Sequence, residues 1–175
     1  MRNKLILALM VLISFFLQCT LMKGIAIGGI SPNLLVVLCI SAGLMRGKAC
    51  GLFMGFFTGL LMDLFYGYYP GINAALYMYL GFVSGFFYQI YYDDDIKLPL
   101  LLAAAGDFIY NFLIFALLFL LQGNTNFSFY LQRVILPEMI YTLVLTALIY
   151  RLYYKIIHRF IRVKFKDSDF LWFVK

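Results

Sequence analysis

The amino-acid sequence predicts an all-α, polytopic membrane protein of six transmembrane helices. Hydrophobic residues make up 65% of its 175 residues and charged residues only 13%, whereas soluble domains are about 45–50% apolar. The apolar residues form six runs separated by glycine, proline or charged residues, and a helix needs about 20 apolar residues to cross a bilayer. The net charge of +6 comes mainly from the ends of these runs. It therefore indicates membrane topology and not a nucleic-acid-binding face.

The six apolar runs cover residues 4–22, 32–45, 49–66, 72–92, 98–121 and about 134–157. The first run imitates a secretory signal, because Arg2 and Lys4 precede the apolar residues that begin at Leu5. However, Gln18 stands before Cys19 where a lipoprotein cleavage site needs a small residue, so we expect a retained helix. The second run is short, and we expect it to use its flanking residues, to tilt or to be partly re-entrant.

The positively charged residues predict the orientation of these helices. With the N-terminus inside, twelve of the fourteen Lys and Arg residues fall on the cytoplasmic side, and Lys23 and Arg133 fall outside. This asymmetry follows the positive-inside rule. It predicts six spans with both termini in the cytoplasm, a membrane domain over residues 1–157 and a basic cytoplasmic tail over residues 158–175.

Glycine recurs every four residues through the third run. Four residues turn a helix by about 400°, so these glycines lie on neighbouring sectors and form a shallow groove. Spacing of this kind lets two helix backbones approach closely in a bilayer. We therefore expect a central third helix that packs tightly against a neighbour along its length. The expected helix-packing residues are Gly47, Gly51, Gly55 and Gly59 on the third helix and Gly81 and Gly85 on the fourth.

Asp63 continues the same four-residue spacing, near the predicted outer end of the third helix. A charged side chain at the bilayer centre costs about 2.5–3.5 kcal/mol, so Asp63 is expected to face protein and to find hydrogen-bond donors. No basic residue is close in sequence, and the expected donors are the backbone amides of the 69–71 turn or the side chain of Asn73. We interpret Asp63 and Asn73 as buried polar or partner-docking residues. A role in ion coupling is the alternative for Asp63.

Two further acids lie in the later runs. Asp107 is near the middle of the fifth run, and Asn111, four residues on, shares its helix face. Hydrogen bonding between helices is the simpler interpretation of this pair, and a substrate or proton site is the alternative. Glu138 follows Pro137. Because proline and an acid are both typical of a first helical turn, we expect Glu138 to mark the start of a helix.

The C-terminal segment has a basic face. Its cations recur at steps of three or four residues, with tyrosine, isoleucine and phenylalanine on the opposite side. This pattern is typical of a helix that leaves the membrane and lies along anionic lipid, and a face for a cytoplasmic protein is the alternative. The residues of this face are Arg151, Lys155, Arg159, Arg162 and Lys166.

No pattern in the sequence predicts an enzyme, a cofactor or a metal site. The single histidine, His158, lies in the basic tail, and there is no nucleotide-binding loop or nucleophile with a plausible base. Cys19, Cys39 and Cys50 have no metal-ligand spacing, so we expect them to act as small hydrophobic residues.

Several features of the first half together resemble the MreD family of bacterial rod shape-determining membrane proteins. The residues that carry this resemblance are Pro32-Asn33, Arg46-Gly47-Lys48, Gly55, Gly59, Asp63, Gly71, Asn73, Ala74 and Leu76. The resemblance implies a non-enzymatic, multi-pass subunit of the cell-elongation machinery in the bacterial cytoplasmic membrane. Its implied partners are MreC, the filament protein MreB, and the polymerase and transpeptidase of lateral wall growth.

The same family is similar in its six-helix fold to the substrate-binding subunits of energy-coupling-factor vitamin transporters, and this supplies a rival function. Under the rival, Asp107, Asn111 and Asn73 would line a small-molecule cavity, and the glycine-rich helices would dock a coupling subunit. The short outer loops, which are poor in polar groups, favour the cell-elongation function.

Overall fold

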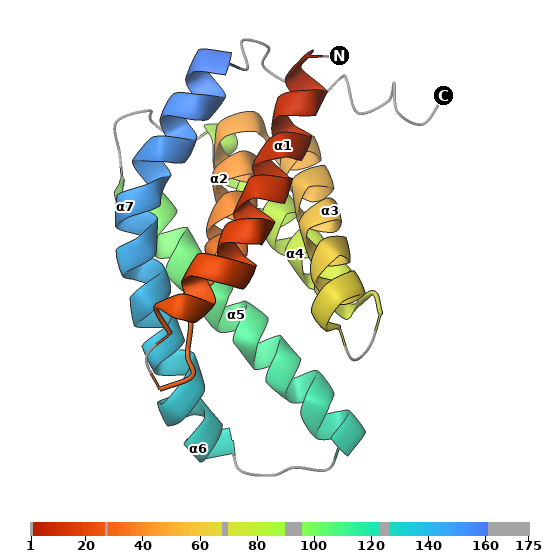
Figure 1. Cartoon of the computed structure of the whole chain (residues 1–175), viewed down its shortest axis with the longest axis vertical. Helices are drawn as coiled ribbons and strands as arrows, with labels where there is room; N and C mark the ends of the chain where they lie inside the picture. The colour runs from red at the N-terminus through yellow and green to blue at the C-terminus, as the bar shows by residue number, and fades with distance from the viewer. Residues whose placement is uncertain (1, 27, 68–69, 90–95, 123–126, 161–175) are drawn as a thin grey trace.

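The computed structural model describes residues 2–26, 28–67, 70–89, 96–122 and 127–160, and all elements of these residues are helical (Figure 1). The α-helices are α1 (Arg2–Leu17), α2 (Leu34–Arg46), α3 (Lys48–Tyr66), α4 (Ile72–Ser84), α5 (Lys97–Gln122), α6 (Phe127–Tyr130) and α7 (Leu136–Phe160). Wider π turns extend α1 over Gln18–Met22 and join α6 to α7 over Leu131–Ile135, and a 3-10 turn extends α4 over Gly85–Gln89.

Four helical segments are long and apolar enough to cross a membrane: Leu5–Met22, Lys48–Tyr66, Lys97–Leu117 and Ser128–Ile157. Two others, Leu34–Arg46 and Ile72–Tyr88, are apolar but shorter. The chain is therefore a multi-pass membrane protein, and four of the six predicted spans have the length of a span. At about 1.5 Å per residue, α2 is about 20 Å long and falls short of the hydrocarbon thickness of about 30 Å.

The short helix α2 is the centre of the bundle. All thirteen of its residues are buried, and it contacts α1, α3, α4, α5 and α7. The prediction of a central third helix is therefore wrong, because one face of α3 is exposed. A helix enclosed by protein on every side does not need to match the bilayer, since its ends meet other helices and not lipid. The exposed α3 residues include Phe56, Phe57, Leu60, Leu64 and Phe65.

The N-terminal end of α2, at Leu34, is capped by side chains that lie outside the helix. Asn33 is its N-cap, and its Oδ1 accepts from the backbone N–H of Val36 at 3.2 Å. Gln18, in the π turn after α1, accepts from the N–H of Leu34 at 2.8 Å and donates to the carbonyl of Pro32 at 3.1 Å. These bonds satisfy backbone groups that would otherwise be unpaired at a buried helix end.

The glycine spacing packs α3 against α4, the most extensive helix pair of the fold. A Cβ atom added at Gly51 would meet the backbone of Gly81, one at Gly55 the backbone of Tyr77, and one at Gly59 the backbone of Asn73, all within 3.0 Å. From one contact to the next, the residue number rises by four on α3 and falls by four on α4, because the two helices are antiparallel. Gly85 extends the series to the backbone of Lys48.

Gly47 does not belong to this packing surface, so its assignment as a packing residue is wrong. A Cβ at Gly47 would meet nothing within 4 Å, and its φ of 87° places it in the left-handed region that glycine adopts without strain. Gly47 is instead the turn that ends α2 and begins α3. Gly43, on α2, was missed, although an added Cβ there would meet the backbone of Gly81.

Pro137 and Glu138 lie in the first turn of α7, so the expected helix start is confirmed. The chain upstream of α7 is also helical, through α6 and the π turn of Leu131–Ile135. Proline lacks an N–H, and its ring clashes with the carbonyl four residues before it, which here is Arg133. The π turn of Leu131–Ile135 surrounds that carbonyl and accommodates the clash.

Candidate functional site

Asp63 joins the end of α3 to the start of α4. Its side chain is only 7% exposed. Oδ2 accepts from the backbone N–H groups of Gly71 at 3.0 Å and Ala74 at 2.8 Å. Oδ1 accepts from the backbone N–H of Asn73 at 3.2 Å and from its Nδ2 at 3.0 Å. The carboxyl group therefore binds the unpaired N–H groups at the N-terminus of α4, where a negative charge is also favoured by the helix dipole.

Gly71 makes this arrangement possible. It is the residue before α4, with a φ of 96° in the left-handed region. This conformation turns the backbone so that the N–H of Gly71 and the first amides of α4 converge on one carboxyl group. We refer to Asp63, Gly71, Asn73 and Ala74 as the Asp63 clasp.

A chain of polar side chains leads from the Asp63 clasp into the bundle. Tyr110 of α5 donates to Oδ1 of Asn73 at 2.7 Å, and its ring packs against that of Tyr77 with centroids 4.9 Å apart. Tyr77 is 1% exposed and donates to Oδ1 of Asn33 at 3.1 Å. The backbone N–H of Asn33 donates to Oγ1 of Thr142 on α7 at 3.1 Å. Helices α2, α4, α5 and α7 are thus connected by hydrogen bonds in the interior of the bundle.

Asp107 lies beside the end of this chain and is 0% exposed. Glu138 and Thr142, one turn apart on α7, both interact with it electrostatically. Neither Asp107 oxygen has a hydrogen bond of good geometry within the described residues. Asn111 donates through Nδ2 to the backbone carbonyl of Asp107 at 3.1 Å, and its side chain also lies close to the Glu138 carboxyl group. The predicted pair is therefore part of a four-residue polar cluster.

The structure brings together residues that the sequence placed in separate runs. Asp63 and Asn73 are in contact, and Tyr110 places Asn73 next to the face of α5 that carries Asp107 and Asn111. Asn33, Tyr77, Tyr110 and Thr142 were not predicted as site residues. The signal for Asn33 is its position after Pro32 and before an apolar run, which is typical of an N-cap. The tyrosines and Thr142 carry no such signal within apolar runs.

The basic face is described only in part. Arg151 and Lys155 are exposed on α7, and the helix continues through Arg159 to Phe160. Arg162 and Lys166 lie outside the described residues, as does most of the predicted tail. Cys39 and Cys50 are buried and Cys19 is partly exposed. Within the described residues, no group of three or more His, Cys, Asp or Glu side chains could hold a metal ion.

These features define a class of protein: a multi-pass α-helical membrane protein whose buried polar groups join helix ends to one another. A sequence model of the family described as rod shape-determining protein MreD matches residues 2–160. The chain belongs to the MreD family, and its role is in the determination of rod shape. No curated protein sequence matches the chain.

Proposed function

We propose that the protein is a non-enzymatic subunit of the bacterial cell-elongation machinery that scaffolds lateral peptidoglycan synthesis through MreC. MreB and the polymerase and transpeptidase of lateral wall growth are further partners in this proposal. The observation that carries it is the use of the Asp63 carboxyl group. Each of its oxygens accepts two hydrogen bonds from the residues at the start of α4. The carboxyl group is therefore fully hydrogen-bonded within the protein and does not need a transported or reacting ligand as a partner.

A rigid α3–α4 pair suits a scaffold. The close backbone contacts at Gly51, Gly55 and Gly59 fix the two helices along their length, and the Asp63 clasp fixes one end. The opposite face of α3 is exposed and rich in phenylalanine. A membrane segment of a partner that packed on this face would meet a surface of fixed shape, which lowers the entropy cost of binding.

In the proposed topology the chain has six spans, with both termini in the cytoplasm. The positions of the cations support this topology. Arg46 donates through Nη2 to the carbonyl of Ile157 at 2.8 Å, so these residues lie at one end of the bundle, and the starts of α1 and α3 lie at that end in Figure 1. Lys23 packs on the ring of Tyr66 at 3.9 Å at the opposite end. Cysteines introduced at Ile96 and Ser128 should therefore react with an impermeant reagent from opposite sides of the membrane, with Ser128 outside.

Purification of the tagged chain from its native membrane tests the proposed function. We expect MreC and the wall-synthesis proteins to co-purify, and we expect Gly55→Leu to reduce their recovery because bulk at this position separates α3 from α4. Recovery of transporter ATPase subunits would instead support the rival transport function. Recovery of neither group, from a chain that is folded, would contradict the scaffold proposal.

A further inference from the structure

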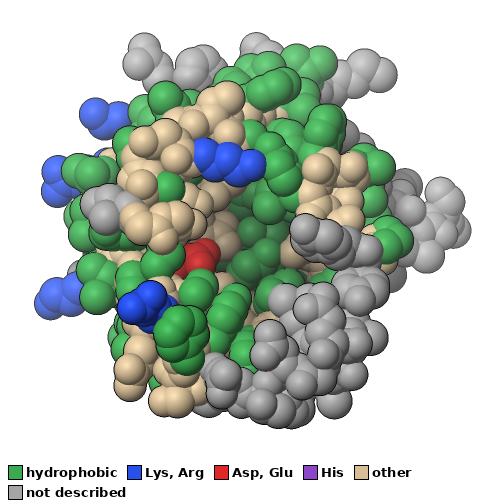
Figure 2. All heavy atoms as spheres, turned by 60° about the horizontal axis from the view of Figure 1, so that its bottom comes forward, with side chains coloured by type: hydrophobic (Ala, Val, Ile, Leu, Met, Phe, Trp, Pro, Cys, Tyr) green, Lys and Arg blue, Asp and Glu red, His purple; other side chains and the backbone are tan. Residues whose placement is uncertain are grey.

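An open cleft lies where the 28–31 loop meets the π turn before α7. Its volume is about 370 Å³, which is within the range of about 300–1,000 Å³ that is usual for small-molecule sites. The backbone of Gly28 and Gly29, the hydroxyl-bearing Ser31, and the side chains of Phe129, Arg133 and Glu138 contribute to its lining. Figure 2 brings this end of the molecule forward and shows acidic surface recessed in a hollow, with basic side chains around it.

The two charged residues of the cleft lie at different depths. Arg133 is exposed, and its guanidinium group lies 5.1 Å from the centre of the Phe129 ring. Glu138 is half-buried. Among the described residues, no carboxyl group forms an ion pair with Arg133. The cleft therefore offers an unpaired cation near its rim and an acid further in.

The interior behind Glu138 also favours a positive charge. Asp107 is 0% exposed, has no hydrogen bond of good geometry within the described residues, and interacts with Glu138. Two acids in a medium of low dielectric repel each other when both are ionised. A ligand that brings a cation to Glu138 offsets this repulsion, whereas an anion at the same place would increase it.

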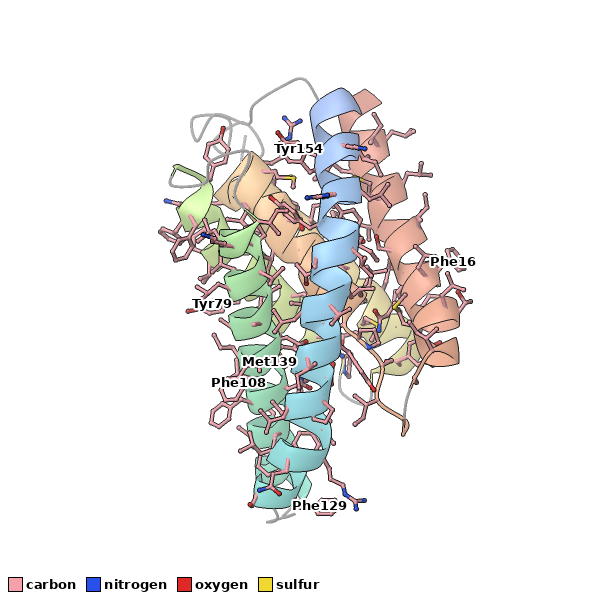
Figure 3. All side chains as sticks on the ribbon, turned by 90° about the vertical axis from the view of Figure 1, so that its left-hand side faces the viewer. Phe16, Tyr79, Phe108, Phe129, Met139 and Tyr154 are labelled. Atoms are coloured by element: carbon pink, nitrogen blue, oxygen red, sulfur yellow. The ribbon has the colours of Figure 1, made fainter. Side chains whose placement is uncertain are left out.

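In the proposed topology, the cleft lies at the depth of lipid headgroups. Arg133 and Arg151 are separated by about 27 Å along the helix at 1.5 Å per residue, close to the hydrocarbon thickness of about 30 Å. Each arginine therefore lies near one boundary of the membrane. Phe129, which Figure 3 labels at the α6 end of the bundle, packs its ring against the Arg133 guanidinium group.

An apolar stripe on α7 leads away from the cleft into the membrane. Its residues are spaced by four and are all exposed: Leu136, Ile140, Val144 and Leu148. Because side chains four residues apart share a helix face, the stripe is continuous. An acyl chain that followed it would begin beside Arg133, which lies three residues before Leu136.

We propose that this cleft binds the headgroup of phosphatidylethanolamine, with the phosphate at Arg133, the ammonium group at Glu138 and an acyl chain along the α7 stripe. The arginine fork matches a phosphate geometrically. The primary ammonium group donates to the Glu138 carboxyl group and, through the short ethanolamine linker, reaches inward from the rim. Phosphatidylcholine has no N–H donor and phosphatidylglycerol has no cation, so each lacks one of the two interactions.

The test uses the full-length chain, equilibrated in detergent with equal amounts of the three lipids and examined by native mass spectrometry. We expect phosphatidylethanolamine to be retained about tenfold more than either other lipid, the difference expected for one charge-assisted hydrogen bond. Glu138→Gln should remove this preference, and Arg133→Gln should lower the retention of all three phosphate-bearing lipids. Lys23→Gln, at the same end of the bundle but outside the cleft, is the matched control and should retain the preference.

Two results would overturn the proposal: equal retention of phosphatidylethanolamine and phosphatidylcholine by the folded wild-type chain, or a preference for phosphatidylglycerol. A photoreactive residue at Ser31 provides a second measurement in native membranes that does not depend on the charged variants. A phospholipid adduct on this residue is expected. An adduct with a protein segment and none with lipid would show that the cleft is a protein-docking site.

Discussion

The Asp63 clasp can be tested by two substitutions that remove different numbers of hydrogen bonds. Asp63→Leu removes all four acceptor interactions with Gly71, Asn73 and Ala74. Asp63→Asn retains one acceptor oxygen but places an NH₂ group against two N–H donors, since each carboxyl oxygen accepts two bonds. The structure therefore predicts a graded series, with the asparagine variant between wild type and the leucine variant.

The expected size of the effect follows from burial. The bond to Ala74 is buried, whereas those to Gly71 and Asn73 are partly accessible, so water replaces some of the lost acceptors. Loss of an N-cap costs about 0.5–2 kcal/mol, and a buried donor without an acceptor costs about 1–3 kcal/mol. We expect Asp63→Leu to lower the free energy of unfolding by about 2–5 kcal/mol, and Asp63→Asn by about half as much.

The buried thiols of Cys39 and Cys50 provide the assay. With Cys19 replaced by serine, a thiol-reactive dye reports unfolding of the purified protein as temperature rises. Leu64→Ala is the control, because Leu64 is next in sequence but 71% exposed, and it should unfold as the wild type does. An equal and large loss in Asp63→Asn and Asp63→Leu would refute the hydrogen-bond argument and favour a role that requires the charge. No loss in Asp63→Leu would refute the clasp itself.

The same assay tests two other parts of the fold. Gly55→Ala should destabilise the protein by about 1–3 kcal/mol through overpacking against Tyr77, while Gly24→Ala should be neutral because a Cβ there meets nothing within 4 Å; equal effects would contradict the packing argument. Asn33→Ala leaves the buried Tyr77 hydroxyl and the Val36 N–H without their acceptor, at about 1–3 kcal/mol each. Tyr77→Phe removes the donor itself and should cost about 1 kcal/mol, so a larger loss in Tyr77→Phe than in Asn33→Ala would contradict the network.

The sequence was informative where a local pattern has one physical use. Apolar runs predicted helices within a few residues for most elements, because each residue in a bilayer must satisfy its backbone bonds within a helix. The glycine spacing predicted close packing at Gly51, Gly55 and Gly59, because glycine every four residues in an apolar helix lets a second helix backbone approach closely. The 69–71 turn and Asn73 were expected to donate to Asp63, and the donors in the structure come from Gly71, Asn73 and Ala74.

The remaining features depend on how helices are arranged in three dimensions. The central position of α2 was missed, because an enclosed helix and a lipid-facing helix are equally apolar in sequence. The π turn before α7 was missed, because Pro137 is compatible both with a helix that follows a loop and with one that follows a π turn. The proximity of Asp107 to the α7 residues Glu138 and Thr142 has no local signature, since these residues lie about 30 positions apart in sequence.

The central claim is that the buried polar groups hold a scaffold together and do not carry an ion or a substrate. Replacement of Asp107 by asparagine tests this claim most directly, because the residue is buried and has no hydrogen bond of good geometry within the described residues. In cells that depend on this chain for their shape, we expect Asp107→Asn to accumulate normally, to retain MreC and to support rods of normal width. Round cells that contain normal amounts of folded Asp107→Asn protein would contradict the account, because they would show that the ionisable group itself is required.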